Sequence, residues 1–270
     1  MKTTVRPRLN ARPLAHLLAG CVLILTAALP ASAQTGSPAA MDDDWHFVAV
    51  PYFWFAGIDG TLTVRGRVDV PIEKSFSDVI SDFDIGLLGH LEGRKRRLGF
   101  AFDVLYLDLG APVATEAPVL GALGVSADVR LLLTEGLGFY RVANGERPDN
   151  PSHLDLLLGA RYVGTSARLR NDVLETGKQE LQWVDAVAGL RFRARLGSRV
   201  SLLGRGDVAG FGSKFTWNVE GDLAIHLSER WALGAGWRHF DIDYDKGEGS
   251  DRKVFGLAFD GPRTWVAHSW

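Results

Sequence analysis

The feature that most constrains the fold is an alternation of apolar and polar side chains with a period of two residues. It is clearest over residues 184–196, where Val184 and Leu190 fall in one row and Asp185 and Arg191 fall in the other. Successive side chains of a β-strand point to opposite faces of its sheet, so this period predicts a strand with one apolar and one charged face. Residues 84–94, 97–109 and 215–227 repeat the pattern. The sequence therefore predicts an all-β fold.

A soluble sandwich would also alternate, and two further observations favour a membrane barrel. The polar rows are dense with charges of both signs, and the apolar rows run the full length of each segment. In a β-barrel in lipid, the apolar row faces the acyl chains and the polar row faces the lumen. Because hydrocarbon cannot satisfy an open sheet edge, such a sheet must close. We therefore predict a closed antiparallel transmembrane β-barrel.

About ten strands are expected, joined by connections that alternate in length. Tight turns are predicted at 94–97, 196–199 and 227–230, and longer loops at 65–82 and 111–123. Short turns on the periplasmic side and longer external loops are typical of these barrels. If residues 61–70 form a separate strand, the alternative count is twelve. The expected strands are 45–64, 83–95, 97–110, 124–142, 153–170, 181–196, 199–212, 214–228, 230–245 and 252–270.

Two positions depart from the expected pattern. If Leu131 and Leu133 face outward, Glu135 lies on the wrong face, which predicts a bulge in that strand. The Gly261-Pro262 pair predicts a second bulge, because proline has no backbone N–H to donate to a neighbouring strand.

Aromatic residues near strand ends are expected to form girdles at the lipid headgroups. These aromatic residues are Trp45, Tyr140, Tyr162, Trp231, Trp265 and Trp270.

The N-terminal segment is typical of a secretory signal peptide. Four basic residues and no acidic residue precede an apolar run over 14–29, and a small-x-small site ends at Ala33. We expect cleavage after Ala33, which gives a signal peptide at 1–33, a periplasmic linker at 34–44 and the barrel at 45–270. A lipoprotein site at Cys21 is the alternative, but only a short apolar core precedes that cysteine.

Composition excludes several classes of function. Cys21 is the only cysteine, so the processed chain has no disulfide. The whole chain has a formal charge of −2 and its first 33 residues contribute +4, so the remainder carries −6. That charge, without a basic stripe, does not predict a nucleic-acid partner. No phosphate-binding glycine loop and no zinc-like spacing occurs, so no cofactor and no metal are expected.

The polar rows identify the candidate site residues, which are charged side chains expected to line the lumen. A ten-strand barrel is narrow, so these charges are either paired in a salt-bridge plug or hydrated along a pathway for small solutes or ions. The sequence leaves both possibilities open. The residues are His90, Glu92, Arg94, Asp103, Arg161, Asp185, Arg191, Arg205, Asp207, Glu220, Asp222 and Arg238.

Catalytic arrangements have less support. His239, Asp241 and Asp243 share one strand face and could activate water in a barrel protease, but no second acidic pair on a facing strand is evident. His268 and Ser269 are adjacent, so they face opposite sides of a strand and cannot form a lipase-like pair. The run 42–44 of aspartates before a strand is read as a solvated linker. No catalytic residue is therefore predicted.

The order of several short motifs resembles a family of Gram-negative outer-membrane β-barrel proteins of unsettled function. The motifs include residues 51–54, 90–94, 103–109, 206–212 and 237–244, and the match spans nearly all of 45–270. The resemblance implies a barrel and supplies no catalytic residues. Trp270, with Val266 and His268 on its face, looks like the C-terminal signal read by the barrel-assembly machinery, although phenylalanine is the commoner final residue there.

Together these features predict a porin-like narrow channel or a structural barrel in the cell outer membrane. Its expected partners are outer-membrane lipid and lipopolysaccharide, the barrel-assembly machinery and, for a channel, small solutes or ions. The alternatives are a surface enzyme, either a protease or a lipid-modifying barrel, and a receptor or adhesion barrel acting through 65–82 and 111–123.

Overall fold

The computed structural model describes residues 44–64, 68–75, 83–112, 126–145, 152–170, 175–248 and 252–270. The predicted signal peptide at 1–33 and nearly all of the predicted linker at 34–44 lie outside these residues, as do most of the two predicted external loops. None of the described segments contains a helix long and apolar enough to cross a bilayer.

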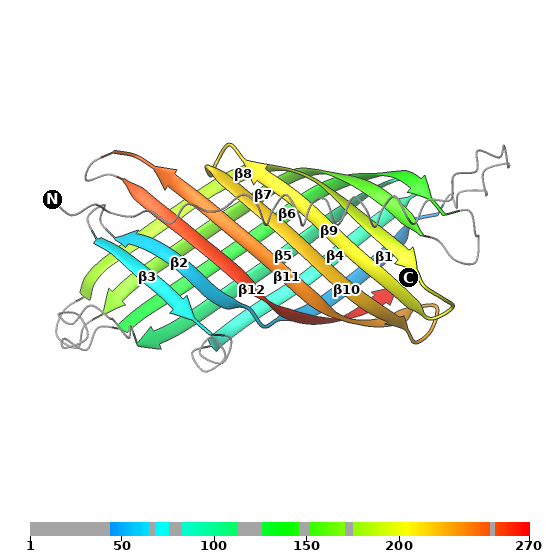
Figure 1. The fold of residues 1–270 in the computed structure, drawn as a ribbon, viewed down its shortest axis with the longest axis horizontal. Coiled ribbons are helices and arrows are strands. Elements are labelled where there is room, and N and C mark those ends of the chain that lie inside the picture. Colours follow the sequence, from blue (N-terminus) through cyan, green and yellow to red (C-terminus); the bar gives the residue numbers. More distant parts are fainter. Residues whose placement is uncertain are drawn as a thin grey trace. The chain divides into compact units, whose positions relative to one another are not determined.

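The described residues form twelve β-strands in one antiparallel sheet (Figure 1). Alternating and β-branched residues favour the strands, and short polar turns join several of them. The strands are β1 (His46–Trp54), β2 (Gly57–Val64), β3 (Val68–Lys74), β4 (Phe83–Lys95), β5 (Leu98–Pro112), β6 (Ser126–Asn144), β7 (His153–Arg170), β8 (Glu175–Arg195), β9 (Val200–Gly210), β10 (Phe215–His226), β11 (Trp231–Lys246) and β12 (Lys253–Ser269).

Ten of these strands close into a barrel. The order runs from β1 to β4 and on through β12, and β12 pairs back with β1, so the ring has no free edge along that stretch. The predicted closed antiparallel barrel of about ten strands is confirmed. Strand β2 continues β1 along β12, and β3 pairs with β2 as an additional strand. The separate segment considered at 61–70 is therefore split between β2 and β3.

The break between β1 and β2 explains the Gly261-Pro262 pair. Strand β12 keeps an unbroken register with β11, so the bulge predicted in β12 is wrong. The irregularity lies in the partner, at residues 55–56, where β12 changes from β1 to β2. The carbonyl of Pro262 accepts from the Phe55 amide at 2.9 Å. A Cβ on Gly261 would lie 2.2 Å from the Phe55 carbonyl oxygen, so this close approach requires glycine.

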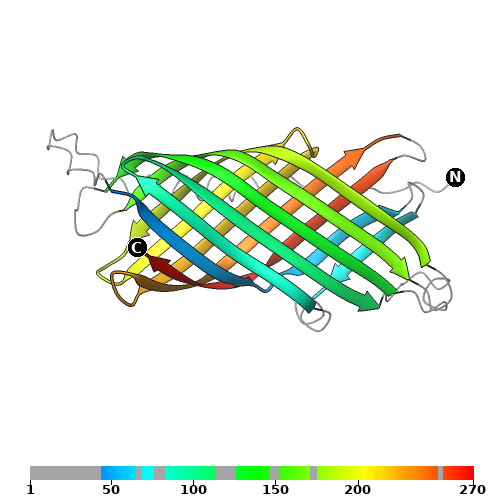
Figure 2. The same cartoon turned by 180° about the vertical axis from the view of Figure 1, so that it is seen from behind.

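We call the end that carries the start of β1, residue 270 and the turns at 96–97, 196–199 and 227–230 the terminal end. The opposite end is called the distal end. Most strands run obliquely between the two ends, as Figure 2 shows for the wall formed by β4 to β8.

The β9–β10 connection at 211–214 is a tight turn, unlike the longer connections expected at the distal end. Its Gly212 and Ser213 amides donate to the Asp185 carboxylate, at 2.9 and 2.6 Å.

Strand β6 corrects the interpretation of Glu135. The predicted bulge depends on Leu131 and Leu133 facing outward, but they are 6% and 1% exposed and point into the barrel together with Glu135. The register between β5 and β6 is continuous there, and the shift against β7 lies further on, between Arg141 and Ala143. A single inward row therefore contains both leucines and the glutamate, so the bulge predicted at Glu135 is wrong.

The polarity of the barrel reverses along its axis. In the terminal half, large apolar side chains are exposed on the outside; Leu158, for example, is 69% exposed. In the distal half the outside is polar, with an Asp108–Arg130 ion pair and exposed Gln182, while the inside is apolar. The expectation of an apolar exterior along whole strands is thus wrong for the distal half. The exposed apolar belt includes Phe53, Leu91, Leu98, Phe100, Phe102, Leu156, Leu158, Val184, Leu190, Val208, Phe215, Leu223, Ile225, Leu233 and Val266.

Aromatic residues border the apolar belt at both ends. Trp45, Tyr140, Trp231 and Trp270 lie exposed at the terminal end, where the sequence placed them. At the distal edge the outward aromatic residues are Tyr106, Tyr162, Trp217 and Trp237. Trp265 does not belong to either girdle, because its ring points inward, where it packs over Gly234 and lines the cavity of the barrel.

Candidate functional site

The interior of the barrel is the candidate functional site, and it has three successive parts. A cavity of about 690 Å³ opens at the terminal end, and we call it the vestibule. Four arginines and four carboxylates, which we call the ionic layer, form its inner end and the layer behind it. The distal half holds an apolar cluster, which we call the apolar plug. The ionic layer comprises Arg161, Arg205, Arg238, Arg263, Glu135, Asp207, Glu220 and Asp222.

The centre of the ionic layer is a square of two arginines and two carboxylates. Arg161 donates through Nε to Glu135 and through Nη2 to Asp207, both at 2.5 Å. Arg205 contacts the same two carboxylates, at 2.8 Å and 2.7 Å. Arg161 is 0% and Glu135 is 1% exposed. Charges so deeply buried are stable only when paired and hydrogen-bonded, and here each carboxylate has two arginine partners.

A second set of contacts extends the layer towards β12. Asn218 donates to Asp207 at 3.1 Å and accepts from Arg238 at 2.8 Å, so a neutral amide joins the two halves. Arg263 then donates to Glu220 at 2.6 Å and holds the Asp222 carboxylate with two further nitrogens. The ionic layer thereby spans the lumen from β6 to β12, with charges of equal number and opposite sign.

The apolar plug lies in the lumen on the distal side of the ionic layer. Its members come from β5 to β8, from β11 and β12, and from the junction between β1 and β2, and they form one buried cluster. Phe240 links the two regions, because the Arg161 guanidinium lies 4.8 Å from its ring centroid and the Arg238 guanidinium 5.7 Å. The buried members are Ala56, Leu105, Leu131, Leu133, Val163, Leu181, Trp183, Phe240, Ile242, Tyr244, Phe255, Leu257 and Phe259.

One wall of the vestibule is built around Arg191. This arginine donates two hydrogen bonds to Glu92, at 2.5 and 2.9 Å, and one to Asp155 at 3.0 Å. Its guanidinium also lies 4.1 Å from the ring centroid of Phe139. Arg141 donates to the other oxygen of Asp155 at 2.8 Å. Three strands, β4, β7 and β8, are therefore held together across the lumen by one guanidinium.

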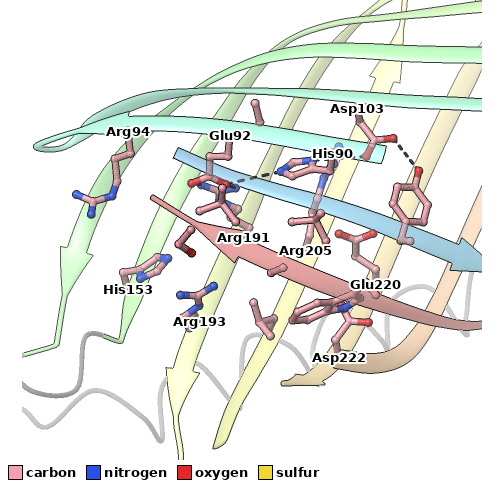
Figure 3. Close-up of a pocket in the computed structure, with 18 of the residues that line it drawn as sticks. His90, Glu92, Arg94, Asp103, His153, Arg191, Arg193, Arg205, Glu220 and Asp222 are labelled. Atoms are coloured by element: carbon pink, nitrogen blue, oxygen red, sulfur yellow. Dashed lines mark hydrogen bonds and ion pairs between the residues drawn. The ribbon is translucent and has the colours of Figure 1, made fainter. Parts of the chain in front are cut away.

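A neighbouring cluster occupies the deeper part of the vestibule. His90 lies between two carboxylates, 3.7 Å from Glu92 and 3.5 Å from Asp103. The hydroxyl of Tyr52 donates to Asp103 at 2.9 Å. Figure 3 shows the His90, Glu92 and Asp103 side chains pointing into the cavity from neighbouring strands, with Arg205, Glu220 and Asp222 at its inner end.

The structure places the candidate residues in different surroundings. His90, Glu92, Arg94, Asp103 and Arg191 line the vestibule, and Arg94 donates to the Arg96 carbonyl at 3.0 Å. Asp185 points inward but caps the β9–β10 turn and does not line the cavity. The remaining six belong to the ionic layer: Arg161, Arg205, Asp207, Glu220, Asp222 and Arg238.

Sequence reasoning missed several partners of these residues. Glu135 was identified as out of place, and the structure makes it the partner of Arg161. Arg141 and Asp155 have the same parity as inward residues of their strands, so the alternation could have identified them. Arg263 could have been found only by continuing β12 past Pro262 without a bulge.

Of the residues considered for catalysis, His239, Asp241 and Asp243 share the outer face of β11 as predicted, whereas His268 and Ser269 lie on opposite faces of β12. His239 faces outward on the distal side of the apolar belt, where its ring packs at a tilt against Trp217 and contacts Asp260 at 2.9 Å. His268 packs on Trp231 on the outside, whereas Ser269 lines the vestibule. In the described part of the chain, no group of three or more His, Cys, Asp or Glu side chains is placed to hold a metal ion.

Comparison with solved structures finds barrels at low sequence identity. The translocator domain of the autotransporter NalP from Neisseria meningitidis is 12% identical over 97% of this chain and 99% of that chain, with a TM-score of 0.40. Neisserial surface protein A is 14% identical over 83% of this chain and 96% of its own, with a TM-score of 0.31. The toluene transporter TodX of P. putida is 8% identical over 84% and 90%, with a TM-score of 0.27.

These similar structures are outer-membrane β-barrels of Gram-negative bacteria, which is the type of protein that the sequence resemblance named. At these values the likeness concerns the fold, and no function is carried over from it. No protein-family model matches the sequence. A search of curated proteins finds no match either.

Proposed function

We propose that this protein is an integral outer-membrane β-barrel that is closed to passive solute flow and acts through its vestibule. The observation that carries the proposal is the filling of the lumen. An ionic layer with no net charge and an apolar plug of thirteen buried side chains follow each other along the axis. Of the two roles that the sequence left open, this packing favours the salt-bridge plug over the hydrated pathway.

The membrane is proposed to surround the terminal half only. The apolar belt lies there, and aromatic residues border it at both edges. A strand that rises about 3.3 Å per residue and is tilted by about 40° covers about 20 Å between Leu98 and Tyr106, close to the ~25 Å apolar band of membrane barrels. The polar distal half would then project beyond the outer leaflet, and the vestibule would open to the periplasm, as the position of both barrel termini indicates.

Substitution of a belt residue tests this placement. Leu158→Arg is expected to lower the free energy of unfolding in lipid by about 2–4 kcal/mol, because it puts a charge among the acyl chains. Urea unfolding in phospholipid vesicles measures the difference. The control is Gln182→Arg, an exposed outward position beyond the belt, where a change of about 0–1 kcal/mol is expected. Equal effects at the two positions would refute the proposed membrane boundary.

Planar-bilayer recording tests the closed lumen. The purified protein is expected to insert without discrete conductance steps, because a permeating ion would have to cross the apolar plug. An established porin reconstituted in the same bilayers confirms that open channels would be detected. Reproducible single-channel openings of the unmodified protein would contradict the proposal and support the narrow-channel hypothesis instead.

The same proposal implies particular partners. The belt would contact phospholipid, and lipopolysaccharide would pack around the outer aromatic edge. The C-terminal strand would be read by the barrel-assembly machinery. In support, Trp270 exchanges backbone hydrogen bonds with Phe47 at 3.0 and 3.1 Å and stacks on its ring at 5.9 Å, so the final residue joins the two ends of the closed sheet.

A further inference from the structure

Arg193 differs from its neighbours Arg141 and Arg191 on the same wall because it has no carboxylate partner. Arg141 and Arg191 share Asp155, and Arg191 also holds Glu92. The Nε of Arg193 is buried without a hydrogen-bond partner, and no described residue forms an ion pair with this side chain. The Arg193 side chain lines the vestibule and no carboxylate neutralises its charge, so a ligand in the cavity that supplies an acceptor to it would be stabilised.

Positively charged neighbours of Arg193 outnumber negatively charged ones. The attraction of Glu92 is opposed by Arg141, Arg191 and Arg195, and Glu92 is already engaged in two hydrogen bonds by Arg191. A charged side chain held among like charges raises the local electrostatic potential, which favours a bound anion.

A second unused polar group lies beside Arg193. His153 is its partner across the β7–β8 ladder, and its Nδ1 is also buried without a hydrogen-bond partner. Its Nε2 lies 3.7 Å from Asp155. Figure 3 shows His153 and Arg193 near each other on the vestibule wall, apart from the side chains joined by dashed lines. Two polar side chains with unsatisfied nitrogens thus face one part of the cavity.

The rest of the vestibule wall is partly apolar. A volume of about 690 Å³ lies within the range of small-molecule sites, which is about 300–1,000 Å³. A site with a cationic corner and an aliphatic wall suits a molecule with an anionic head and a short apolar body. The apolar lining residues are Val48, Val50, Ala101, Leu137, Leu157 and Leu203.

We infer that the vestibule binds a small organic oxyanion, a phosphate or carboxylate on a short apolar body, with Arg193 and His153 contacting the anionic head. Arg193 is the main anchor, because the guanidinium fork matches the geometry of both head groups. The inference concerns the cavity of the barrel and rests on the proposed vestibule. It does not depend on the closed lumen, so anion binding and bilayer conductance fail or succeed independently.

Calorimetric titration of the purified barrel in non-ionic detergent tests the site with hexyl phosphate as the probe. Hexanol and inorganic phosphate serve as comparisons, and protein-free micelles correct for partitioning. Hexyl phosphate is expected to bind with a Kd below about 1 mM and at least tenfold more tightly than either comparison. Absence of hexyl phosphate binding up to about 10 mM, or equal binding of hexanol, would overturn the inference.

Two variants distinguish binding at Arg193 from a nonspecific effect of positive charge. Arg193→Gln is expected to weaken hexyl phosphate binding about tenfold or more, since it removes a charge-assisted contact. Arg195→Gln is the matched control, two residues along the same strand and on the same face. Its guanidinium donates to the carbonyls of Gly197 and Ser198 and does not line the vestibule, so less than a twofold change is expected. Equal losses in both variants would show a nonspecific charge effect and overturn the inference.

Further measurements check that each variant is folded and identify the source of the anion. Heat-modifiable electrophoretic mobility and circular dichroism establish that each variant forms the barrel, and Arg193→Gln removes no ion pair with a described residue. Displacement of hexyl phosphate by dihexanoyl phosphatidic acid would assign the anion to a lipid headgroup. Failure of that lipid to compete would assign it to a free solute. Either result supports an oxyanion site.

Discussion

Arg161→Gln is expected to lower the free energy of unfolding by about 3–5 kcal/mol. The substitution leaves Glu135 and Asp207 buried at 1% and 5% exposure with Arg205 as their only remaining arginine within 4 Å among the described residues. A carboxylate that loses its partner in a low-dielectric interior keeps the full penalty of desolvation, so the effect exceeds the value of one hydrogen bond. Urea unfolding in detergent micelles or vesicles measures the change.

An exposed ion pair of similar length provides the control. Arg130 contacts Asp108 at 2.9 Å on the outside of the barrel, with its side chain 52% exposed. Arg130→Gln is expected to change stability by at most about 1 kcal/mol. A comparable loss in the two variants would show that burial of the ionic layer contributes nothing.

The double variant Arg161→Gln with Glu135→Gln gives an independent test of charge balance. It leaves Arg205 facing Asp207, one charge of each sign, at 2.7 Å. We therefore expect it to be more stable than Arg161→Gln alone, although it removes one more charged group. If it were less stable, hydrogen-bond geometry and not net charge would govern this layer.

Phe240→Ala is expected to destabilise the barrel by about 3–5 kcal/mol. The phenyl ring is 1% exposed, packs 6.3 Å from the ring of Phe259, and lies under the guanidinium of Arg161 at 4.8 Å. Truncation removes buried apolar surface and leaves a cavity at the junction of the apolar plug and the ionic layer. The measurement is the same unfolding titration.

Phe53→Ala is the matched control for this substitution. Its ring is 66% exposed on the apolar belt, where lipid or detergent can occupy the vacated space. A much smaller loss of stability is expected there. Equal losses for Phe53 and Phe240 would contradict the assignment of one ring to the membrane face and the other to a packed interior.

Much of the architecture could be predicted from local pattern. A period of two along a strand is independent of its neighbours, so the rows of residues 184–196 and 215–227 were assigned to the correct faces in the terminal half. The prediction was wrong where apolar residues do not mark a membrane face. Leu131 and Leu133 pack inside, because the distal half is built like a water-soluble barrel with an apolar core.

The individual contacts of the interior could not be predicted, because they join residues distant in sequence. Glu92 meets Arg191 and Glu135 meets Arg205 across the lumen, and no local spacing links either pair. The lone position of Arg193 is also a property of the assembled wall, since its sequence neighbour of the same parity, Arg191, is fully paired.

The sequence by itself determined that this chain forms strands with two unlike faces and that the sheet closes as a barrel, because side-chain alternation and the cost of unpaired backbone in lipid act on each strand. Only the tertiary structure decided which side chains meet inside the lumen. The outcome depends on strand register and stagger, which set the height at which each inward side chain meets the others. That stagger brings four arginines and four carboxylates to one level and thirteen apolar side chains to the next, so the barrel is filled.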